Sequence, residues 1–384
     1  MKLTFEPDVL AAALRQAALR LPKRPKFPAM AGIQLTATDG HVRLAAGDFH
    51  TTARIPVPAV VQEPGVALLP GRLLVGLARA LPVDSPVDLT VQEGIAHLQA
   101  GPVQASIPVQ AAVEEFPSAP RLPRPCGQLP GAELHQAVAQ VAGAAAPEDY
   151  GLPVLTGVRI DLDGRYMRVM ATDRYRLAVR KVRLPRTGRT RTTGPVLIPA
   201  RELAQTARAL RHAEHVSVAL PSDAEQPLAL TIDDGTAFTH RAIDGDLPRF
   251  ENLMPAEADI ATTAVVDNKA LLQTLARAQQ VLERNVPICL HADPDRQQLT
   301  LTGGFPEARN IPQITERVPV RQLAGAEMTI AFNPRFLADG VKAIGGKQVQ
   351  LAFTRPTKPA LLRAPAATVT DLRYLVMPTR RSDD

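Results

Sequence analysis

The sequence predicts an α+β protein made of three tandem copies of one domain. Its 384 residues exceed what a single hydrophobic core usually holds. One helical segment recurs three times along the chain, and alternating apolar and polar runs lie between the copies. With 45% hydrophobic and 21% charged residues, the chain has the composition of a folded protein. The expected domains cover residues 1–120, 125–252 and 260–384.

The recurring segment occupies residues 72–81, 201–210 and 335–344. Each copy begins with Arg, has Leu two positions later, and carries Arg or Lys, then Ala, then Leu or Ile at its end. A proline stands one or two positions before each copy. The spacing between copies is one domain length, which is the signature of an internal repeat.

Each unit also opens with a segment of helical periodicity. Pro7 and Asp8 precede the first, Pro130 and Gly131 the second, and Asp267 the third, as expected at helix starts. Alternating stretches that begin near residues 32, 157 and 287 predict paired strands, and Asp163-Gly164 predicts a hairpin turn. We therefore expect each domain to run helix, strands, helix, strands.

The second helix of each unit carries two cations seven residues apart. At 3.6 residues per turn they share one face, about 10 Å apart. The pairs are Arg72 with Arg79, Arg201 with Arg208, and Arg335 with Lys342. The first helices add Arg15, Arg20, Lys269 and Arg277. A solvated face is the ordinary interpretation of one such helix, but three copies favour a surface for phosphates.

Several classes of function find no support in the sequence. Cys126 and Cys289 are the only cysteines, too far apart for a metal-ligand spacing or a disulfide framework, which fits a reducing cytoplasm. No run of about 18 apolar residues predicts a membrane span. No nucleophile elbow or zinc-protease motif occurs, so no catalytic residue, metal or cofactor is predicted. The net charge of +6 permits a polyanionic partner, and the scarcity of aromatic residues favours duplex over single strands.

Three segments resemble one known family. Residues 155–160, 171–179 and 374–380 are similar to the bacterial DNA sliding clamp, the beta subunit of DNA polymerase III. Residues 71–82, 331–334 and 358–363 resemble its actinobacterial branch. The resemblance implies a head-to-tail homodimeric ring with helices inside and sheets outside, closed around double-stranded DNA. It further implies a non-catalytic processivity factor of DNA replication in the cytoplasm.

The resemblance also implies two sets of site residues. Polymerase subunits, the clamp loader and repair proteins would attach by linear peptides to an apolar groove. That groove would include Leu155, Thr172, Arg174, Tyr175, Arg176, Leu177, Pro248, Leu253, Asn333, Phe336, Leu375, Val376, Met377, Pro378 and Arg380. Core packing is the alternative for Leu177 and Val376. The expected DNA contacts are Arg24, for which a solvated loop cluster is the alternative, and the helix cations Arg72, Arg79, Arg201, Arg208, Arg277, Arg335 and Lys342. The loop at residues 148–150 occupies a second contact position, but its acids suit phosphate poorly.

Two departures from the family pattern concern charge. The chain is basic, whereas family members are usually acidic. The expected ring edges have also lost matched charge, because residues 96–105 contain no Arg or Lys and residues 305–311 pair one acid with one arginine. Two alternatives follow: a specialised second clamp that does not mix with an ordinary one, such as an inhibitor-resistance copy, or a monomeric scaffold that keeps only the peptide groove.

Overall fold

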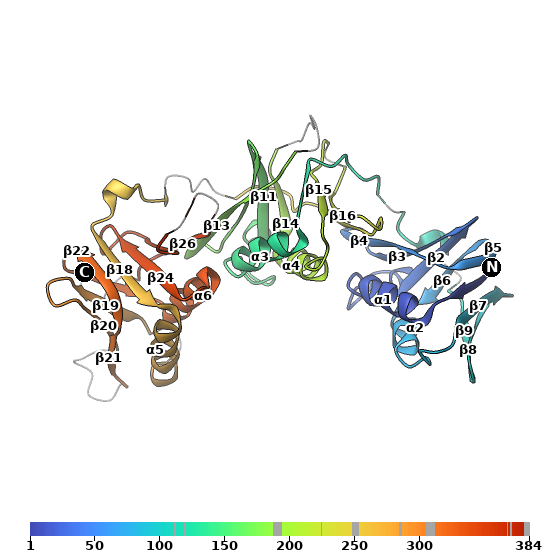
Figure 1. Cartoon of the computed structure of the whole chain (residues 1–384), viewed down its shortest axis with the longest axis horizontal. Coiled ribbons are helices and arrows are strands. Elements are labelled where there is room, and N and C mark those ends of the chain that lie inside the picture. The colour runs from blue at the N-terminus through green and yellow to red at the C-terminus, as the bar shows by residue number, and fades with distance from the viewer. Residues whose placement is uncertain are drawn as a thin grey trace. The chain divides into compact units, whose positions relative to one another are not determined.

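The computed structural model describes residues 1–110, 113–118, 120–186, 194–223, 225–247, 253–283, 286–304, 312–366, 368 and 371–379. These residues form two compact units. Unit 1 comprises Met1–His135 and Leu184–Ala242, and unit 2 comprises Gln136–Arg183 and Ile243–Asp384. Both combine helices with antiparallel sheets (Figure 1), so the α+β class is confirmed.

Unit 1 contains two antiparallel sheets. The five-stranded sheet has the order β5-β1-β7-β8-β9, and the eight-stranded sheet has the order β10-β15-β16-β17-β4-β3-β2-β6. The strands of these sheets are β1 (Lys2–Phe5), β2 (Gly32–Thr38), β3 (His41–Gly47), β4 (Thr51–Val57), β5 (Val60–Glu63), β6 (Gly65–Pro70), β7 (Val87–Gln92), β8 (Ile95–Ala100), β9 (Val103–Pro108), β10 (Gly127–Leu129), β15 (Val216–Ala219), β16 (Leu228–Ile232) and β17 (Ala237–His240). Strand β14 (Val196–Pro199) belongs to neither of these two sheets. The helices are α1 (Pro7–Ala18), α2 (Gly71–Ala78) and α4 (Ala200–Ala209), with short 3-10 turns η1 (Pro28–Ala31) and η2 (Val113–Glu115).

Unit 2 is built the same way. Its strands pair in the order β11-β12-β13-β26-β25-β24-β18-β22, and a further sheet has the order β21-β20-β19-β23. The strands are β11 (Gly157–Asp163), β12 (Tyr166–Thr172), β13 (Arg176–Arg183), β18 (Thr262–Asp267), β19 (Ile288–Asp293), β20 (Gln298–Gly303), β21 (Ile314–Val318), β22 (Val320–Gly325), β23 (Met328–Phe332), β24 (Gln348–Phe353), β25 (Ala360–Arg363) and β26 (Arg373–Val376). The helices are α5 (Asn268–Val281) and α6 (Pro334–Ile344), with 3-10 turns η3 (Pro153–Thr156) and η5 (Glu257–Asp259); α3 (Gly131–Ala142) crosses the chain position that divides the units.

The predicted helix starts and the hairpin are confirmed. Pro7 opens α1, and the Asp267 side chain caps α5 by accepting the Ala270 N–H at 2.9 Å. The β11–β12 hairpin turns at Asp163-Gly164, where Gly164 adopts a φ of +62° and Asp163 faces Tyr166. A positive φ costs glycine little, because it lacks the Cβ that would clash.

The recurring segment forms α2, α4 and α6. On each helix the predicted inner face is buried, as at Leu74, Leu203 and Leu337, while the paired cations are exposed. Helix α2 ends earlier than the repeat predicts, since Arg79 is its C-cap residue. Pro82 disfavours helical backbone at Leu81, the last residue of this copy, so the helix does not extend over the whole repeat.

We expected Arg20 to be one of the exposed cations of the first helix, and this expectation was wrong. Helix α1 ends at Ala18, and Arg20 is only 3% exposed. Its Nη2 donates to the Thr206 hydroxyl at 3.1 Å and to the Glu202 carbonyl at 3.4 Å. Burial lowers its pKa to about 10. Helical periodicity placed the residue on a face but could not show that α4 covers it.

Candidate functional site

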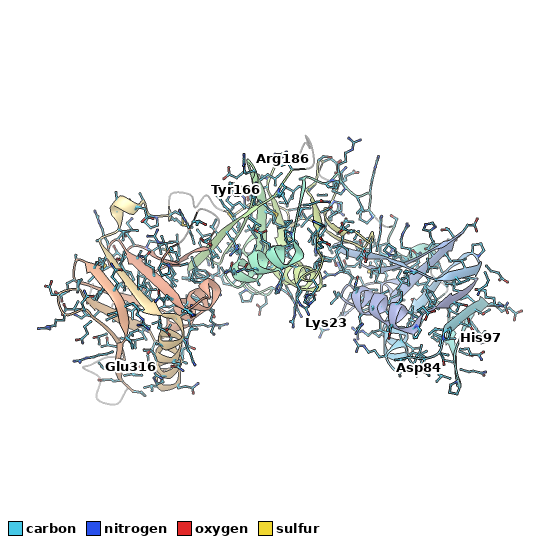
Figure 2. The ribbon with its side chains drawn as sticks, in the orientation of Figure 1. Lys23, Asp84, His97, Tyr166, Arg186 and Glu316 are labelled. Carbon is cyan, nitrogen blue, oxygen red and sulfur yellow. The ribbon has the colours of Figure 1, made fainter. Side chains whose placement is uncertain are left out.

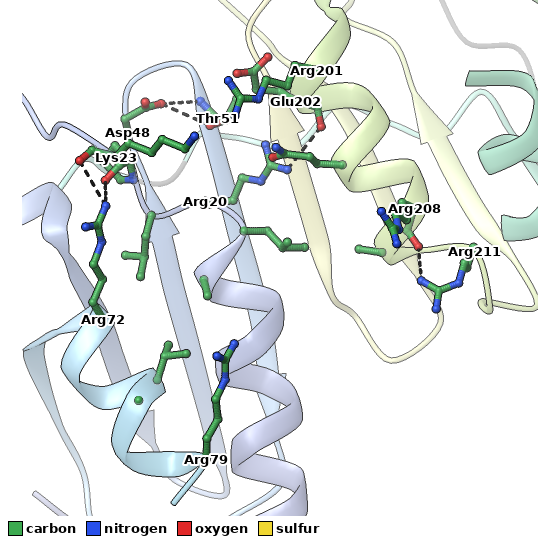
Figure 3. A pocket seen from close by; sticks show the side chains of 18 residues that line it. Arg20, Lys23, Asp48, Thr51, Arg72, Arg79, Arg201, Glu202, Arg208 and Arg211 are labelled. Atoms are coloured by element: carbon green, nitrogen blue, oxygen red, sulfur yellow. Dashed lines mark hydrogen bonds between the residues drawn. The ribbon is translucent and has the colours of Figure 1, made fainter. Parts of the chain in front are cut away.

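A basic concave surface of unit 1 lies where the end of α1, helix α2 and helix α4 meet (Figure 3). This basic hollow has a volume of about 820 Å³. Its charged lining residues are Arg20, Lys23, Asp48, Arg72, Arg79, Arg201, Glu202, Arg208 and Arg211. Cations therefore outnumber acids, and four of the eight residues predicted to contact DNA line one surface.

The hollow sets two carboxylates, Asp48 and Glu202, against seven cationic side chains. The Asp48 carboxylate accepts the backbone N–H groups of His50 and Thr51, both at 2.8 Å. Arg72 donates through Nη2 to the carbonyls of Pro22 and Lys23, at 3.3 and 3.2 Å. Arg72 thereby anchors the loop that also carries the exposed Arg24. Such a surface suits phosphate oxygens, which bind cations without sequence preference.

The predicted DNA contacts of unit 2 divide into two kinds. Arg335 and Lys342 are exposed on α6. Arg277 on α5 donates through Nε to Glu316 Oε2 at 2.9 Å and makes a second bond through Nη2 to Oε1 (Glu316 is labelled in Figure 2). The hydrogen bonds that Glu316 accepts from Arg277 hold the pKa of the Glu316 carboxyl below its usual range. The charge of Arg277 is thus already matched within unit 2.

Most of the predicted groove residues converge at one end of the β13–β26 pair in unit 2. Arg176 faces Val376 and Leu177 faces Leu375 across the ladder. Beyond the strand end, the Met377 N–H donates to the Tyr175 carbonyl at 2.8 Å. The middle segment and the C-terminal segment, distant in sequence, are thereby joined through their backbones.

Helix α6 packs beside this end of the β13–β26 pair. The Tyr175 ring stacks on Phe336 with centroids 5.7 Å apart, and the Arg176 guanidinium lies 4.8 Å from the same ring. Arg176 Nη1 also donates to Asp339 at 2.6 Å, while its Nε donates to Asp173 at 2.9 Å. Aromatic stacking and paired charges therefore fix α6 against the strand end.

The predicted residues differ in exposure. Leu177, Leu375 and Val376 are at most 3% exposed, which fits the core-packing alternative. Tyr175 is 51% and Leu253 46% exposed. Leu155, Thr172 and Arg176 are buried, Asn333, Phe336, Met377 and Pro378 are half-buried, and Arg174 is exposed. Pro248 and Arg380 lie outside the described residues, as does the edge segment 305–311.

Arg174 has an unusual backbone for an arginine, with a φ of +79°. Its Nη2 donates to the Tyr150 hydroxyl at 2.6 Å, and its guanidinium lies 5.5 Å from that ring. The loop predicted as a second DNA-contact position is therefore bonded to the turn that carries Tyr175. This contact holds the arginine in a conformation that costs non-glycine residues free energy.

Sequence reasoning missed Asp173 and Asp339, the two carboxylates that hold Arg176. Asp173 also accepts the N–H groups of Tyr175 and Arg176, both at 3.0 Å. A signal was present, because Asp48 occupies the same place relative to the first set of strands. Asp339 could be found only once α6 was placed beside β26.

The structure bears on two further expectations. No described helix is long and apolar enough to cross a membrane. Within the described ranges, no group of three or more His, Cys, Asp or Glu side chains could hold a metal ion. His215 Nδ1 lies 3.4 Å from Asp233 Oδ2, and both side chains are exposed.

Comparison with known families accounts for nearly the whole chain. Residues 1–120 match the DNA polymerase III beta subunit N-terminal domain, residues 128–249 its central domain, and residues 251–380 its C-terminal domain. Three successive matches agree with the threefold repeat, and each falls on one copy of it.

Individual relatives and structures agree. The chain is 38% identical to the beta sliding clamp of Streptomyces coelicolor, over the full length of both, and 34% identical to the beta sliding clamp homolog GriR of Streptomyces muensis, over 99% of each. The fold matches the sliding clamp of Bacillus subtilis with a TM-score of 0.88 at 24% identity, over 99% of each chain. It matches a Pseudomonas aeruginosa clamp bound to griselimycin with a TM-score of 0.86 at 23% identity, over 99% of this chain and all of that one. The chain therefore belongs to the bacterial beta sliding clamp family, the beta subunits of DNA polymerase III.

Proposed function

We propose that this protein is a DNA sliding clamp that closes as a head-to-tail dimer around duplex DNA in the bacterial cytoplasm. The observation that carries the proposal is the recurring helix: all three copies expose two cations on one face and bury the other face. Four of those cations line the basic hollow of unit 1. Phosphate contacts of this kind provide affinity without base recognition, as a ring that must slide requires.

Two sheet edges support ring closure. Within the chain, β4 pairs with β17 and β13 pairs with β26. The corresponding strands of the repeat, β21 and β9, each end a sheet in the strand orders of the described residues. We infer that β21 of one protomer pairs with β9 of its partner, repeating the two internal pairings. An edge strand offers the unpaired N–H and C=O groups such pairing needs.

The side chains of β9 and β21 offer few charges that could form ion pairs across the ring interface. Strand β9 has no charged residue. On β21, Glu316 is engaged by Arg277 of its own unit, and the exposed Arg317 would meet no opposite charge on β9. Closure would therefore depend on backbone hydrogen bonds and apolar contacts rather than on matched charges. A ring of this kind would also have little attraction for the charged edge of a different clamp.

The ring would act without catalysis, by tethering partners at the β13–β26 end. Tyr175, Phe336 and Met377 would contact apolar side chains of a linear peptide, and Asn333 with Arg174 would orient its backbone. A polymerase held this way stays at high effective concentration near its primer end. The three functional domains would be residues 1–120, 125–252 and 260–384.

Mass in solution and retention on DNA test this proposal together. Sedimentation equilibrium should give a dimer, and the loaded protein should remain on circular duplex but leave linear duplex through its ends. A monomer at micromolar concentration would instead support a scaffold that keeps only the peptide site. Equal loss from both DNA forms would contradict the ring.

A further inference from the structure

Two phenylalanines distant in sequence meet at the surface of unit 1. The rings of Phe27 and Phe49 lie edge to face, with centroids 6.1 Å apart and an interplanar angle of 87°. Phe27 is 48% and Phe49 53% exposed. An edge-to-face contact covers at most one face of one ring, so part of each ring stays open to water. We call these two residues the aromatic pair.

The backbone that carries the aromatic pair is held in place. Phe27 is the N-cap residue of η1, and its carbonyl accepts the Met30 N–H at 3.1 Å. Phe49 stands in the turn between β3 and β4, where the Asp48 carboxylate accepts the Thr51 N–H at 2.8 Å. Because the two rings are already positioned, a ligand that covers them loses little free energy to ordering the protein.

Unit 2 carries other side chains at the corresponding positions. Leu152 is the N-cap residue of η3, as Phe27 is of η1. Arg174 follows an aspartate that caps its turn, as Phe49 does. An aliphatic and a cationic side chain stand there in place of two rings. The same backbone arrangement therefore forms without an aromatic pair.

The loop that leads to Phe27 is strongly basic. Lys23, Arg24 and Lys26 are all exposed, and no Asp or Glu occurs in residues 20–38. Two carbonyls of this loop accept hydrogen bonds from a side chain of α2, which fixes the loop beside that helix. Three cations on one anchored loop suit the phosphates of a nucleic-acid strand.

The basic hollow reaches both segments that carry the aromatic pair (Figure 3). Lys23 lines the hollow from the loop that leads to Phe27. Asp48 and Thr51 line it from the turn that carries Phe49. Since the hollow holds seven cationic side chains against two carboxylates, a strand lying in it would have its phosphates neutralised directly beside the two rings.

A smaller cavity that Phe49 also borders has a different charge. Its acids are Asp48 and Glu225, and its cationic side chains are Arg241 and, when protonated, His50. These charges give phosphate no advantage there. We therefore place phosphates on the basic loop and in the basic hollow, and an uncharged group at the rings.

We propose that the aromatic pair stacks an unpaired base of a DNA strand whose phosphates lie in the basic hollow and on the loop at residues 22–26. Every nucleobase has a flat apolar face, so stacking on a ring needs no particular sequence. The few aromatic residues of the sequence favoured duplex alone, but folding brings two of the ten phenylalanines together beside cations. The inference rests on the proposed function, because it places a strand leaving the duplex on the surface that binds duplex.

Two DNAs with the same duplex test the proposal on the full chain. One is blunt, and the other carries a single-stranded overhang of about eight thymidines. Phe27→Leu with Phe49→Leu should lower the affinity for the overhang DNA about fivefold or more, the effect of losing one stacked base, and leave the affinity for blunt duplex unchanged. Phe49→Tyr, which keeps an aromatic ring, should retain the affinity. Fluorescence anisotropy of labelled DNA measures each variant.

The matched control is Val66→Ala, which removes an apolar side chain that is 51% exposed and belongs to neither the loop nor the hollow. It should bind both DNAs as the unchanged protein does. Melting temperatures equal to that of the unchanged protein would show that each variant is folded.

Photochemical crosslinking tests stacking without relying on affinity. A single-stranded oligomer carrying one 5-iodouracil couples on irradiation to an aromatic ring in contact with that base, and mass spectrometry identifies the residue. We expect the adduct on Phe27 or Phe49. Adducts only elsewhere, such as on Tyr175, overturn the proposal, as does an overhang affinity that the two leucine substitutions leave unchanged. Neither result alters retention on circular duplex, so the ring proposal is tested separately.

Discussion

The two strand junctions of this chain, β4–β17 in unit 1 and β13–β26 in unit 2, have one backbone and two sets of side chains. In both, an aspartate caps the turn and the next strand begins at the same register. Only in unit 2 does the residue after the turn, Arg176, form ion pairs with Asp173 and with Asp339 of α6. The backbone thus defines where a site can form, and the side chains define what it binds.

The largest difference between the junctions should appear on removing the capping carboxylate. Asp173→Ala leaves the buried Arg176 with one fewer partner and two N–H groups unsatisfied, so we expect a loss of roughly 3 kcal/mol of stability. Asp48→Ala removes backbone caps without a buried ion pair, and should cost about 1 kcal/mol. Thermal unfolding of both variants checks this, with exposed Asp244→Ala as the control. Equal losses would remove the distinction.

The cations of the two units should contribute differently to DNA binding. Arg79→Ala with Arg208→Ala should lower the slope of log affinity against log salt by about 1.8, since each phosphate contact contributes about 0.9. Arg277→Ala should change the slope less, because Glu316 already matches its charge. Titration of labelled duplex at several salt concentrations measures both. A larger change for Arg277→Ala would show that the ion pair opens on DNA.

The junctions should also differ in their response to acid. His240 is fully buried beside Arg20 and hydrogen-bonded to Thr206, and burial lowers its pKa from 6.5 to about 3. Between these values the unfolded chain binds the proton and the folded chain does not, so stability falls as pH drops, by up to about 1.4 kcal/mol per pH unit.

The counterpart of His240 in β26 is Val376, which suggests the matched variant. His240→Val should remove this contribution to the pH slope, at the loss of one hydrogen bond to Thr206. Melting temperatures at pH 7 and pH 5 give the slope for each protein. An unchanged slope would assign the acid sensitivity to other groups.

The smallest effect concerns the paired hydroxyls. Thr52→Val leaves Thr239 without its bond and should cost about 1 kcal/mol, whereas Thr52→Val with Thr239→Val should be nearly neutral. The double variant imitates the apolar pair Leu177 and Leu375. Melting temperatures of the single and double variants make the comparison, and additive losses would show that the hydroxyls act independently.

Periodicity and spacing alone determined much of this protein. The repeat of residues 72–81, 201–210 and 335–344, the exposed cations at its first and eighth positions, and the hairpin at Asp163-Gly164 all follow from local rules that the printed sequence obeys. These features need no knowledge of what packs against them.

Only the tertiary structure decided which elements meet. The burial of Arg20 against Thr206, the pairing of Arg277 with Glu316, and the contact of Arg176 with Asp339 join residues far apart in the chain. So do the β4–β17 and β13–β26 pairings, which place Thr52 opposite Thr239 at one junction and Leu177 opposite Leu375 at the other. Periodicity shows which face of an element is apolar but not what covers it, because long-range contacts depend on the packing of the whole fold.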